Sequence, residues 1–334
     1  MTTFKIGNAS VDYHFDGSLK SLKELCDIKR TIVLTDENVF EAQGKKLKGW
    51  NCIVLKPGEA YKIQATVDSV LGQLIELGAD RGWTLVGMGG GVVTDLAGYI
   101  ASVFLRGIRC GFVPTTLLAL VDASIGGKNG IDVGVYKNMV GTIRQPAFIL
   151  HDYSLLKTLP EGEWRSGFAE IIKHAAIKDA ALFDELEAGS TAFYRKNKTA
   201  LAELVERNAL LKTRIVRADE TEQGERRLLN FGHTLGHALE NQYELTHGEA
   251  ISIGMAFAAR LSAQRLQFKE ADRIVGLLEK YGLPVDAKYK KEKVLPVLLK
   301  DKKKEGSAIR FILLQRIGKA VVEEMALTKI EELL

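Results

Sequence analysis

Four short runs of β-branched and apolar residues recur through the first third of the chain, separated by stretches of helical character. The helical stretches cover residues 37–47 and 63–78, and the second ends at Gly78. Continuous apolar runs are typical of strands buried on both faces, and their alternation with helices predicts a parallel sheet covered on both sides. FKIGNASVDYHF (4–15) is expected to add a hairpin at the sheet edge. The four runs are TIVLTD (31–36), NCIVLK (51–56), WTLVGMG (83–89) and IRCGFVP (108–114).

Three consecutive glycines, Gly89–Gly91, end the third of these runs and precede VVTDLAGYIASVF (92–104), which is predicted to be a helix. Glycines let a ligand approach the backbone closely, and the free amides at a helix start attract a pyrophosphate group. Asp95 lies just inside that helix, where its carboxylate could accept a hydrogen bond from an inner amide or from a ribose. The spacing does not match the GxGxxG dinucleotide fingerprint, and a glycine run alone is also typical of a tight turn.

A second strand end supports the nucleotide hypothesis. In VPTTLLALVDAS (113–124), Thr115 and Thr116 stand at another predicted helix start. The carboxyl ends of parallel strands meet at one edge of the sheet, and ligands of such folds bind there. The two strand ends together therefore predict a nucleotide site at that edge.

The following stretch, VDASIGGKNGIDVGVYKNMVG (121–141), contains five glycines and is expected to be a flexible loop. It exposes the amine groups of Lys128 and Lys137 and the amide of Asn138. Two interpretations remain open. The loop is either simply solvated or a basic clamp for phosphate and carboxylate groups near the nucleotide.

Three of the six histidines fall within fifteen residues, at His233, His237 and His247. On a helix with Asn230 as its N-cap, His233 and His237 would share one face, with Glu240 a further turn along. His247 is expected to begin the next helix. Two helix starts could thus aim imidazoles at one divalent metal, although a hydrogen-bonded pair of surface histidines gives the same spacing.

A further candidate ligand lies in EGEWRSGFAEIIKHAAIKD (161–179), a predicted helix that carries Glu170 and Lys173 three residues apart. An exposed ion pair on a helix surface is one interpretation of this spacing. The small neighbouring residue Ala169 instead favours a packed face, on which Glu170 could be the third ligand of a His, His, Glu site with one open position.

From Ser154 onward the pattern is mainly helical, including a long predicted helix at 200–218 that carries Lys212, so we place a domain boundary between residues 153 and 154. Two strand-like runs, IRFILLQ (309–315) and KAVVEE (319–324), stand near the end. The fold class is therefore an α/β domain with a Rossmann-like parallel sheet (1–153) followed by an all-α domain (154–334).

Composition limits the classes of function. The 334 residues are 46% hydrophobic and 26% charged, as in ordinary globular proteins, and the net charge of +4 is spread along the chain. This distribution argues against a nucleic-acid surface but allows a local basic pocket for an anionic substrate. Cys26, Cys52 and Cys110 show no paired spacing, which favours a reducing compartment. With no visible signal peptide and no apolar run of the ~18 residues that a membrane span needs, a soluble cytoplasmic protein is expected.

These motifs, taken together, resemble one family, 3-dehydroquinate synthase, within the sugar-phosphate cyclases. The resemblance runs from about residue 57 to 318, and the first ~50 residues add little. The combined pattern is highly specific. The matching segments are PGEAYK (57–62), GGGVVTD (89–95), RGI (106–108), PTTLLALVDASIGGKNGID (114–132), YKNMVG (136–141), LKTLP (156–160), GFAEIIKHA (167–175), RRLLNFGHTLGHALE (226–240), HGEAISIGM (247–255) and DKK (301–303).

The resemblance implies an NAD-binding first domain, a metal- and substrate-binding second domain, and a homodimer. It assigns the divalent metal, Zn or Co, to Glu170, His233 and His247, and makes His237 a substrate-side residue rather than a ligand. Two departures bear on loop conformation. Thr94 stands where relatives often have glycine, and Val135-Tyr136 fills a stretch that is usually smaller.

Matching positions also imply the cofactor and substrate contacts. NAD contacts are expected at Glu59, Lys62, Gly91, Val92, Val93, Thr94, Asp95, Thr115, Thr116, Asp122, Lys128, Lys137, Leu155, Leu156, Lys157 and Thr158. Substrate or catalytic contacts are expected at Arg106, Asp122, Lys128, Lys137, Asn138, Lys173, Lys212, Arg226, Asn230, His237 and either Lys302 or Lys303.

The implied substrate, 3-deoxy-D-arabino-heptulosonate 7-phosphate, carries a carboxylate and a phosphate, which explains a pocket rich in lysine and arginine. The family converts it to 3-dehydroquinate in the shikimate pathway by transient oxidation with NAD, phosphate elimination, reduction, ring opening and aldol closure. Three alternatives remain: another sugar-phosphate cyclase, an NAD- and metal-dependent polyol dehydrogenase, and a non-catalytic binding module. The first would change the pocket around Asn230 and His237, the second usually takes an aspartate ligand, and the third would not need all motifs intact.

Overall fold

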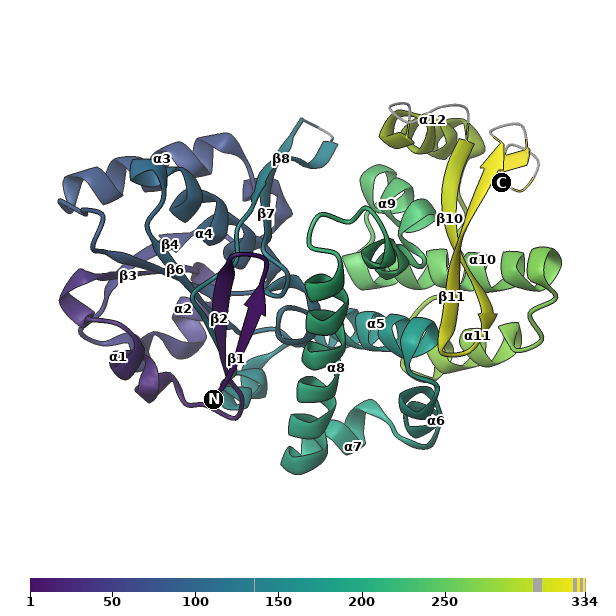
Figure 1. Ribbon diagram of the computed structural model, residues 1–334, viewed down its shortest axis with the longest axis horizontal. Coiled ribbons are helices and arrows are strands. Elements are labelled where there is room, and N and C mark those ends of the chain that lie inside the picture. The colour runs from purple at the N-terminus through teal and green to yellow at the C-terminus, as the bar shows by residue number, and fades with distance from the viewer. Residues whose placement is uncertain (135, 303–307, 327–328, 331–332, 334) are drawn as a thin grey trace. The chain divides into compact units, whose positions relative to one another are not determined.

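The structure is a computed structural model that describes residues 1–134, 136–302, 308–326, 329–330 and 333, without the side chains of residues 299–302 (Figure 1). The chain forms two compact units. Residues Met1–Glu163 and Ala202–Thr221 make up the first unit, and Trp164–Leu201 and Glu222–Leu334 make up the second.

A seven-stranded sheet forms the centre of the first unit, with strand order β1-β2-β9-β6-β5-β3-β4. All pairs in it are parallel except the antiparallel hairpin β1–β2 at one edge, as predicted for residues 4–15. The four predicted strands are confirmed as β3 to β6, but β4 is an edge strand and its Val54 is exposed, so burial on both faces is wrong for β4. The strands are β1 (Thr2–Ile6), β2 (Ala9–His14), β3 (Thr31–Asp36), β4 (Asn51–Leu55), β5 (Thr84–Gly89), β6 (Arg109–Pro114) and β9 (Phe148–Leu150).

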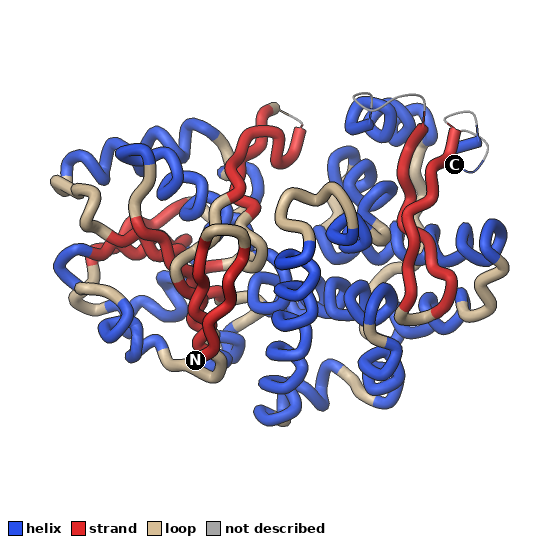
Figure 2. The backbone as a smooth tube through the Cα atoms, in the orientation of Figure 1, coloured by secondary structure: helices blue, strands red, loops and turns tan. Residues whose placement is uncertain are grey.

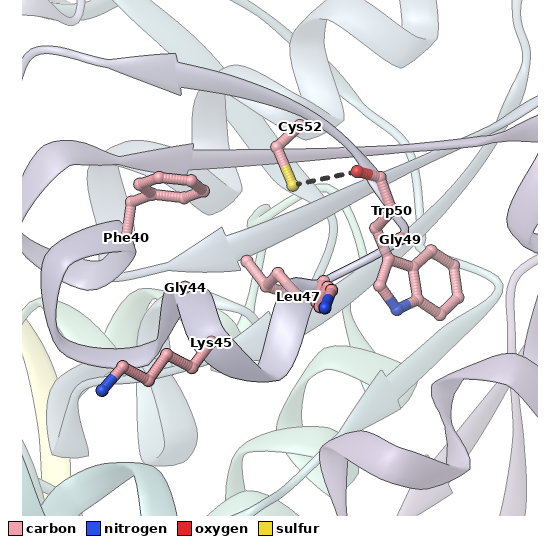
Figure 3. A pocket seen from close by; sticks show the side chains of 8 residues that line it. Phe40, Gly44, Lys45, Leu47, Gly49, Trp50 and Cys52 are labelled. Carbon is pink, nitrogen blue, oxygen red and sulfur yellow. Dashed lines mark hydrogen bonds between the residues drawn. The ribbon is translucent and has the colours of Figure 1, made fainter.

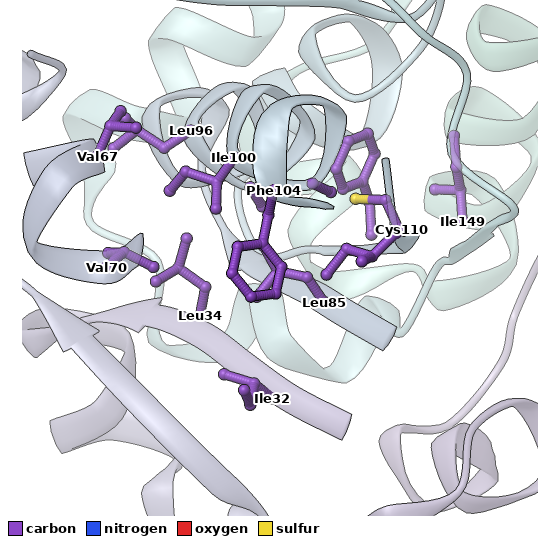
Figure 4. Packing of buried hydrophobic residues seen from close by; sticks show 14 of the residues in the cluster. Ile32, Leu34, Val67, Val70, Leu85, Leu96, Ile100, Phe104, Cys110 and Ile149 are labelled. Atoms are coloured by element: carbon purple, nitrogen blue, oxygen red, sulfur yellow. The ribbon is translucent and has the colours of Figure 1, made fainter. Parts of the chain in front are cut away.

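Helices cover this sheet and close its core. The predicted helices are confirmed as α2 (Glu37–Gln43), α3 (Gln64–Glu76) and α4 (Gly91–Val103), preceded by the short α1 (Leu22–Leu25). Figure 4 shows side chains of α3 and α4 packed against those of β3 and β5. Each fully buried aliphatic side chain contributes about 1.5–3 kcal/mol, so this layer holds α4 and its glycine-rich start firmly on the sheet.

The prediction of a flexible loop over residues 121–141 is wrong. From Lys128 onward the chain forms an antiparallel hairpin of β7 (Lys128–Val133) and β8 (Tyr136–Ile143). Gly130 and Gly141 lie opposite each other, and a side chain on Gly141 would come within 2.2 Å of a carbonyl oxygen on β7. Gly130 and Gly141 therefore permit close strand approach instead of flexibility, and sequence composition alone does not distinguish the two uses.

The two units do not divide at residues 153 and 154. Most of α8 (Lys198–Ala218) belongs to the first unit, because Ala209 and Val216 are buried in its core. The Thr213 hydroxyl also lies 2.9 Å from the Tyr13 hydroxyl. A continuous helix shows no change of composition at such a crossing, so the sequence pattern gave no sign of it.

The second unit is helical, as Figure 2 shows by its colouring, and it also contains the antiparallel hairpin β10–β11 at the two strand-like runs. No described helix is both long and apolar enough to cross a membrane. Its elements are α5 (Glu161–Lys178), α6 (Ala180–Ala188), α7 (Thr191–Lys196), α9 (His233–Gln242), α10 (His247–Leu266), α11 (Ala271–Lys280), α12 (Lys291–Lys302), β10 (Ala308–Arg316) and β11 (Lys319–Ala326).

Candidate functional site

The start of α4 in the first unit has the features of an anion site. Gly90 is the N-cap and has no side chain with which to cap the first helix amides. A side chain at Gly90 would come within 3.1 Å of Thr116, and one at Gly91 within 3.3 Å of Ala123. The Thr115 hydroxyl is buried, and within the described part of the chain it has no hydrogen-bond partner. Uncapped amides, glycines at a close approach and an unsatisfied hydroxyl together fit the pyrophosphate and ribose of a dinucleotide.

Thr94, which departs from the family pattern, does not block this helix start. It is buried, and its hydroxyl donates to the Gly91 carbonyl oxygen at 3.0 Å, inside its own helix. The threonine therefore satisfies its polar group locally. Of the second departure, Tyr136 begins β8, whereas Val135 lies outside the described residues.

Lys62 brings together residues predicted for NAD and for substrate. Its ammonium lies 2.6 Å from Asp95 Oδ2 and 2.6 Å from Asn138 Oδ1. Glu59 Oε1 lies farther away, at 3.9 Å, and 3.8 Å from the Lys137 ammonium. Burial lowers the pKa of Lys62, but the carboxylates of Asp95 and Glu59 outweigh burial and raise it above its ordinary value, so the ammonium stays charged.

Two further predicted residues of the first unit meet at α8. The Lys212 ammonium lies 2.9 Å from Asp122 Oδ1 and donates to the Asp122 carbonyl oxygen at 2.8 Å. Asp122 belongs to a π-helical turn, Ala119–Ala123, that follows β6. Helix segments with this geometry are frequent at functional sites.

The remaining predicted residues of the first unit lie on several separate elements. Arg106 has a positive φ of 64° and is exposed, and Lys128 is exposed at the start of β7. Val92 and Val93 lie in the first turn of α4, where Val93 packs against Gly89. Leu155, Leu156, Lys157 and Thr158 form part of a 3₁₀ helix, Tyr153–Thr158, with both leucines buried.

In the second unit, Glu170 from α5, His233 from α9 and His247 from α10 come together. One possible ligand atom from each lies within 4.8 Å of the other two. Glu170 Oε1 is 3.0 Å from His247 Nε2 and 3.5 Å from His233 Nε2. Two imidazole nitrogens facing one buried carboxylate form the donor set that zinc and cobalt prefer, so the residues fit a divalent metal.

The outer nitrogens of both histidines are held by the surrounding protein. His233 Nδ1 lies 3.1 Å from the Phe231 carbonyl oxygen, and His247 Nδ1 lies 3.4 Å from Glu240 Oε2. Such contacts fix which ring nitrogen faces a metal. Glu240 was expected near the histidines but was not assigned this role, for which the general signal is a carboxylate that holds a metal-bound histidine.

The N-cap of α9 is Gly232, not Asn230 as expected. Gly232 has φ +81°, and a side chain there would come within 2.5 Å of Met255 on α10. Only glycine therefore fits where α9 begins close to α10. The Asn230 amide instead donates to the Glu222 carboxylate. The prediction that His247 begins α10 is confirmed.

The ionisable groups of this cluster shift one another's pKa values. Burial and the neighbouring Lys173 hold the pKa of His233 well below its ordinary value, against the opposing effect of Glu170. Burial also lowers the pKa of His247, but hydrogen bonds from its ring to the carboxylates of Glu170 and Glu240 outweigh burial and raise the pKa to about 10. The two carboxylates therefore favour positive charge beside them, which also suits a divalent cation.

Lys173 and Glu170 are ion-paired, with side chains only 2% and 0% exposed, so the exposed surface pair is excluded. Arg226, also predicted for substrate, is buried on the 3₁₀ helix Glu225–Asn230. The His237 ring centroid lies 5.0 Å from that of His233. Lys303 and the side chain of Lys302 lie outside the described residues.

Figure 3 shows a different feature, a shallow pocket of about 520 Å³ beside β4 in the first unit. Its lining contains none of the predicted site residues. The lining residues are Phe40, Gly44, Lys45, Leu47, Lys48, Gly49, Trp50 and Cys52.

Two family models match adjacent parts of the chain. The model for the N-terminal part of 3-dehydroquinate synthase matches residues 52–166, and the model for its C-terminal part matches residues 167–304. The chain belongs to the 3-dehydroquinate synthase family. The 3-dehydroquinate synthase of Pelobacter propionicus is 41% identical, with 96% of this chain and 94% of that protein covered. The enzyme of the same name from Halorhodospira halophila is 44% identical over 88% of this chain and 86% of its own length.

Solved structures of related cyclases have the same fold. A 2-epi-5-epi-valiolone synthase from Streptomyces hygroscopicus subsp. jinggangensis with NAD⁺ and Zn²⁺ bound is 28% identical, with a TM-score of 0.89 over 100% of this chain and 97% of that one. A 2-deoxy-scyllo-inosose synthase complexed with carbaglucose-6-phosphate, NAD⁺ and Co²⁺ is 26% identical, with a TM-score of 0.85 over 99% and 98%. An iron-containing alcohol dehydrogenase from Thermotoga maritima is 15% identical, with a TM-score of 0.68 over 97% of this chain and 96% of that one, and this likeness shows the fold alone.

Proposed function

We propose that the protein is a 3-dehydroquinate synthase, a carbon–oxygen lyase that converts 3-deoxy-D-arabino-heptulosonate 7-phosphate to 3-dehydroquinate and phosphate in the shikimate pathway. The identity of about 40% with enzymes of this name over most of the chain carries the assignment. The cyclases that make other carbocycles share 28% and 26% identity, which favours the dehydroquinate reaction over theirs.

Glu170, His233 and His247 would hold the divalent metal, and the start of α4 would hold NAD. When bound, NAD supplies reversible hydride transfer, and the metal polarises hydroxyl oxygens of the substrate. Zinc and cobalt both suit one carboxylate and two imidazoles, and the related cyclases were solved with Zn²⁺ and Co²⁺.

In the second unit, buried and charged side chains would balance the charge of the metal ligand Glu170 and orient the substrate. The buried Lys173 ammonium neutralises the Glu170 carboxylate, which limits the cost of keeping that carboxylate away from water. Arg226, Asn230 and His237 would orient the substrate from the same unit. A guanidinium binds a phosphate or carboxylate in a bidentate manner, which suits a substrate with both groups.

In the first unit, Lys128 and Lys137 would bind anionic groups of the substrate from the hairpin β7–β8. Both belong to a hairpin of paired strands rather than to a flexible loop, so strand pairing limits the positions that they can adopt. Lower conformational entropy loss on binding favours affinity and correct orientation. Asp95, held by Lys62, would lie beside the nucleotide at α4.

The finer parts of the proposal rest on the family resemblance. These are a homodimer, a cytoplasmic location, the individual contact residues, and the assignment of NAD binding to the first unit and of metal binding to the second. Size-exclusion chromatography with light scattering would test the dimer directly.

One experiment separates the classes of function. The reaction is redox-neutral overall, because the hydride removed early returns before the product leaves, so NAD is needed only in catalytic amounts. Purified protein is given a divalent metal, NAD far below the substrate concentration, and the heptulosonate phosphate. Phosphate release and NADH absorbance are then followed together.

A 3-dehydroquinate synthase releases phosphate well beyond one equivalent of NAD and accumulates no NADH. A polyol dehydrogenase would instead build up NADH until NAD is exhausted and release no phosphate, and a binding module would do neither. Glu170→Gln should abolish phosphate release, whereas Glu249→Gln, in the exposed capping box of α10, should retain it. NADH accumulation without phosphate would reject the proposed function.

A further inference from the structure

Two functional segments of the first unit are joined through one residue, Asp132 of β7. We call Glu59–Lys62 the nucleotide loop and β7–β8 the substrate hairpin. The Asp132 amide donates to the Lys62 carbonyl oxygen at 2.8 Å, and Ile63 forms a parallel bridge with Asp132. The backbone of the hairpin is thus tied to the end of the nucleotide loop.

The side chain of Asp132 makes a second link, within the hairpin. Asp132 Oδ1 accepts a hydrogen bond from the backbone N–H of Asn138 at 2.8 Å, and Asp132 is only 9% exposed. Asn138 has φ +55°, in the left-handed region that L-residues rarely adopt. A carboxyl oxygen that accepts from its backbone N–H offsets the cost of this backbone conformation.

The Asn138 side chain then completes a closed path. Its Oδ1 accepts from the Lys62 ammonium at 2.6 Å, and the same ammonium lies 2.6 Å from Asp95 Oδ2 on α4. The path runs from α4 through Lys62 and Asn138 to Asp132, and back through the backbone to Lys62. All of its members belong to the first unit.

We propose that Asp132 is a positioning residue that couples NAD binding at α4 to the ordering of the substrate hairpin. The inference rests on the proposed function only in placing NAD beside Asp95. A ligand that fixes Asp95 also restrains Lys62, and through Asn138 it restrains the turn that carries the substrate-binding side chains. By linkage, a substrate that orders the hairpin strengthens NAD binding by the same factor.

Hydrogen–deuterium exchange of the full-length protein measures this coupling without turnover. Exchange of the β8 amides, Tyr136–Ile143, is followed with and without saturating NAD. In the parent protein, NAD should slow exchange by at least about 5-fold, the lower end of typical coupling between sites. Asp132→Asn, which keeps an acceptor oxygen, should retain most of this protection, and Asp132→Ala should lose it.

Asp27→Ala is the matched control, because Asp27 Oδ1 also accepts one backbone amide, from Lys29 at 2.9 Å, in an exposed turn. It should leave NAD-dependent protection of β8 unchanged. If Asp132→Ala fails to fold, Asn138→Gly replaces it. Glycine adopts the left-handed backbone without strain but cuts the link to Lys62, so NAD-dependent protection should again be lost.

Equal protection of β8 by NAD in the parent protein and in Asp132→Ala or Asn138→Gly would overturn the coupling. Failure of the proposed function gives a different result, because a parent protein that binds NAD but releases no phosphate still reports the coupling by exchange. Absence of NAD binding by calorimetry would overturn both. A residue with only a structural role would raise exchange with and without NAD equally and leave their ratio unchanged.

Discussion

Two glycines inside helices of the first unit should respond to alanine in opposite directions. Gly98 lies on α4, where an added Cβ would come within 1.9 Å of Asn129 Oδ1 and 2.3 Å of its Cγ. Gly72 lies inside α3, where an added Cβ meets nothing within 4 Å. Helix propensity alone predicts that both substitutions stabilise the protein by about 1 kcal/mol.

At Gly98 the contact with Asn129 outweighs this gain. The Asn129 amide is buried and donates to the Gly127 carbonyl oxygen at 2.8 Å and to the Arg144 carbonyl oxygen at 3.0 Å. To admit the methyl group, Asn129 has to leave both acceptors, which costs about 1 kcal/mol each, and overpacking costs a further ~1–3 kcal/mol. After the propensity gain, we expect Gly98→Ala to destabilise the protein by about 2–4 kcal/mol.

Urea unfolding, followed by circular dichroism, measures both variants against the parent protein. The expected result is a lower urea midpoint for Gly98→Ala and a higher one for Gly72→Ala. Because Asn129 adjoins Lys128, only Gly98→Ala should also raise KM for the sugar phosphate. Stabilisation by Gly98→Ala would show that α4 and β7 are not in the close contact on which this reasoning depends.

Three further predictions concern the metal cluster, the hairpin and a buried histidine. Glu240→Gln should weaken metal affinity about 10-fold in a chelator competition, because the carboxylate orients His247. His247→Ala should abolish stoichiometric metal binding. Unchanged metal affinity in Glu240→Gln would show that Glu240 does not orient His247 for the metal. Lys128→Ala and Lys137→Ala should each lower kcat/KM at least about 10-fold with little change in melting temperature, and parental turnover in both would leave the lysines as solvated side chains. Burial lowers the pKa of His151 to about 4, so the unfolded chain takes up a proton first as pH falls below 6.5. The parent protein should therefore lose about 3 kcal/mol more stability than His151→Phe between pH 7 and pH 4, measured by urea unfolding, and parallel losses would contradict a buried neutral imidazole.

Local sequence patterns predicted most elements around the sites. The strands β3 to β6 and the helix after Gly89–Gly91 follow from apolar runs and glycines, because these signals depend on neighbouring residues. The start of α10 at His247 was predicted in the same way. The three-residue strand β9 was not, since it is too short for a periodic pattern and exists only by pairing with β2 and β6.

The same distinction applies to the candidate sites. The histidine spacing and the family resemblance named Glu170, His233 and His247 as ligands from the sequence alone. Residue spacing by itself also allowed His237 and left Glu170 as a possible surface pair. Spacing along one helix carries no information about a second helix, so the choice among these residues depends on how α5, α9 and α10 pack.

The residue types of the candidate sites were therefore predicted from the sequence, because they depend only on which residues occur and in what order. The tertiary structure decided which groups meet. Asp132 lies within the family motif at residues 114–132. Its proposed positioning role depends on a contact that only the structure shows, the 2.8 Å hydrogen bond from the backbone N–H of Asn138 to its carboxylate. The glycines of 121–141 predicted a flexible loop. Strand pairing shows instead that Gly130 and Gly141 permit close backbone approach. In both cases the deciding interaction joins residues whose separation is set by strand register, and register is fixed by packing across the whole unit.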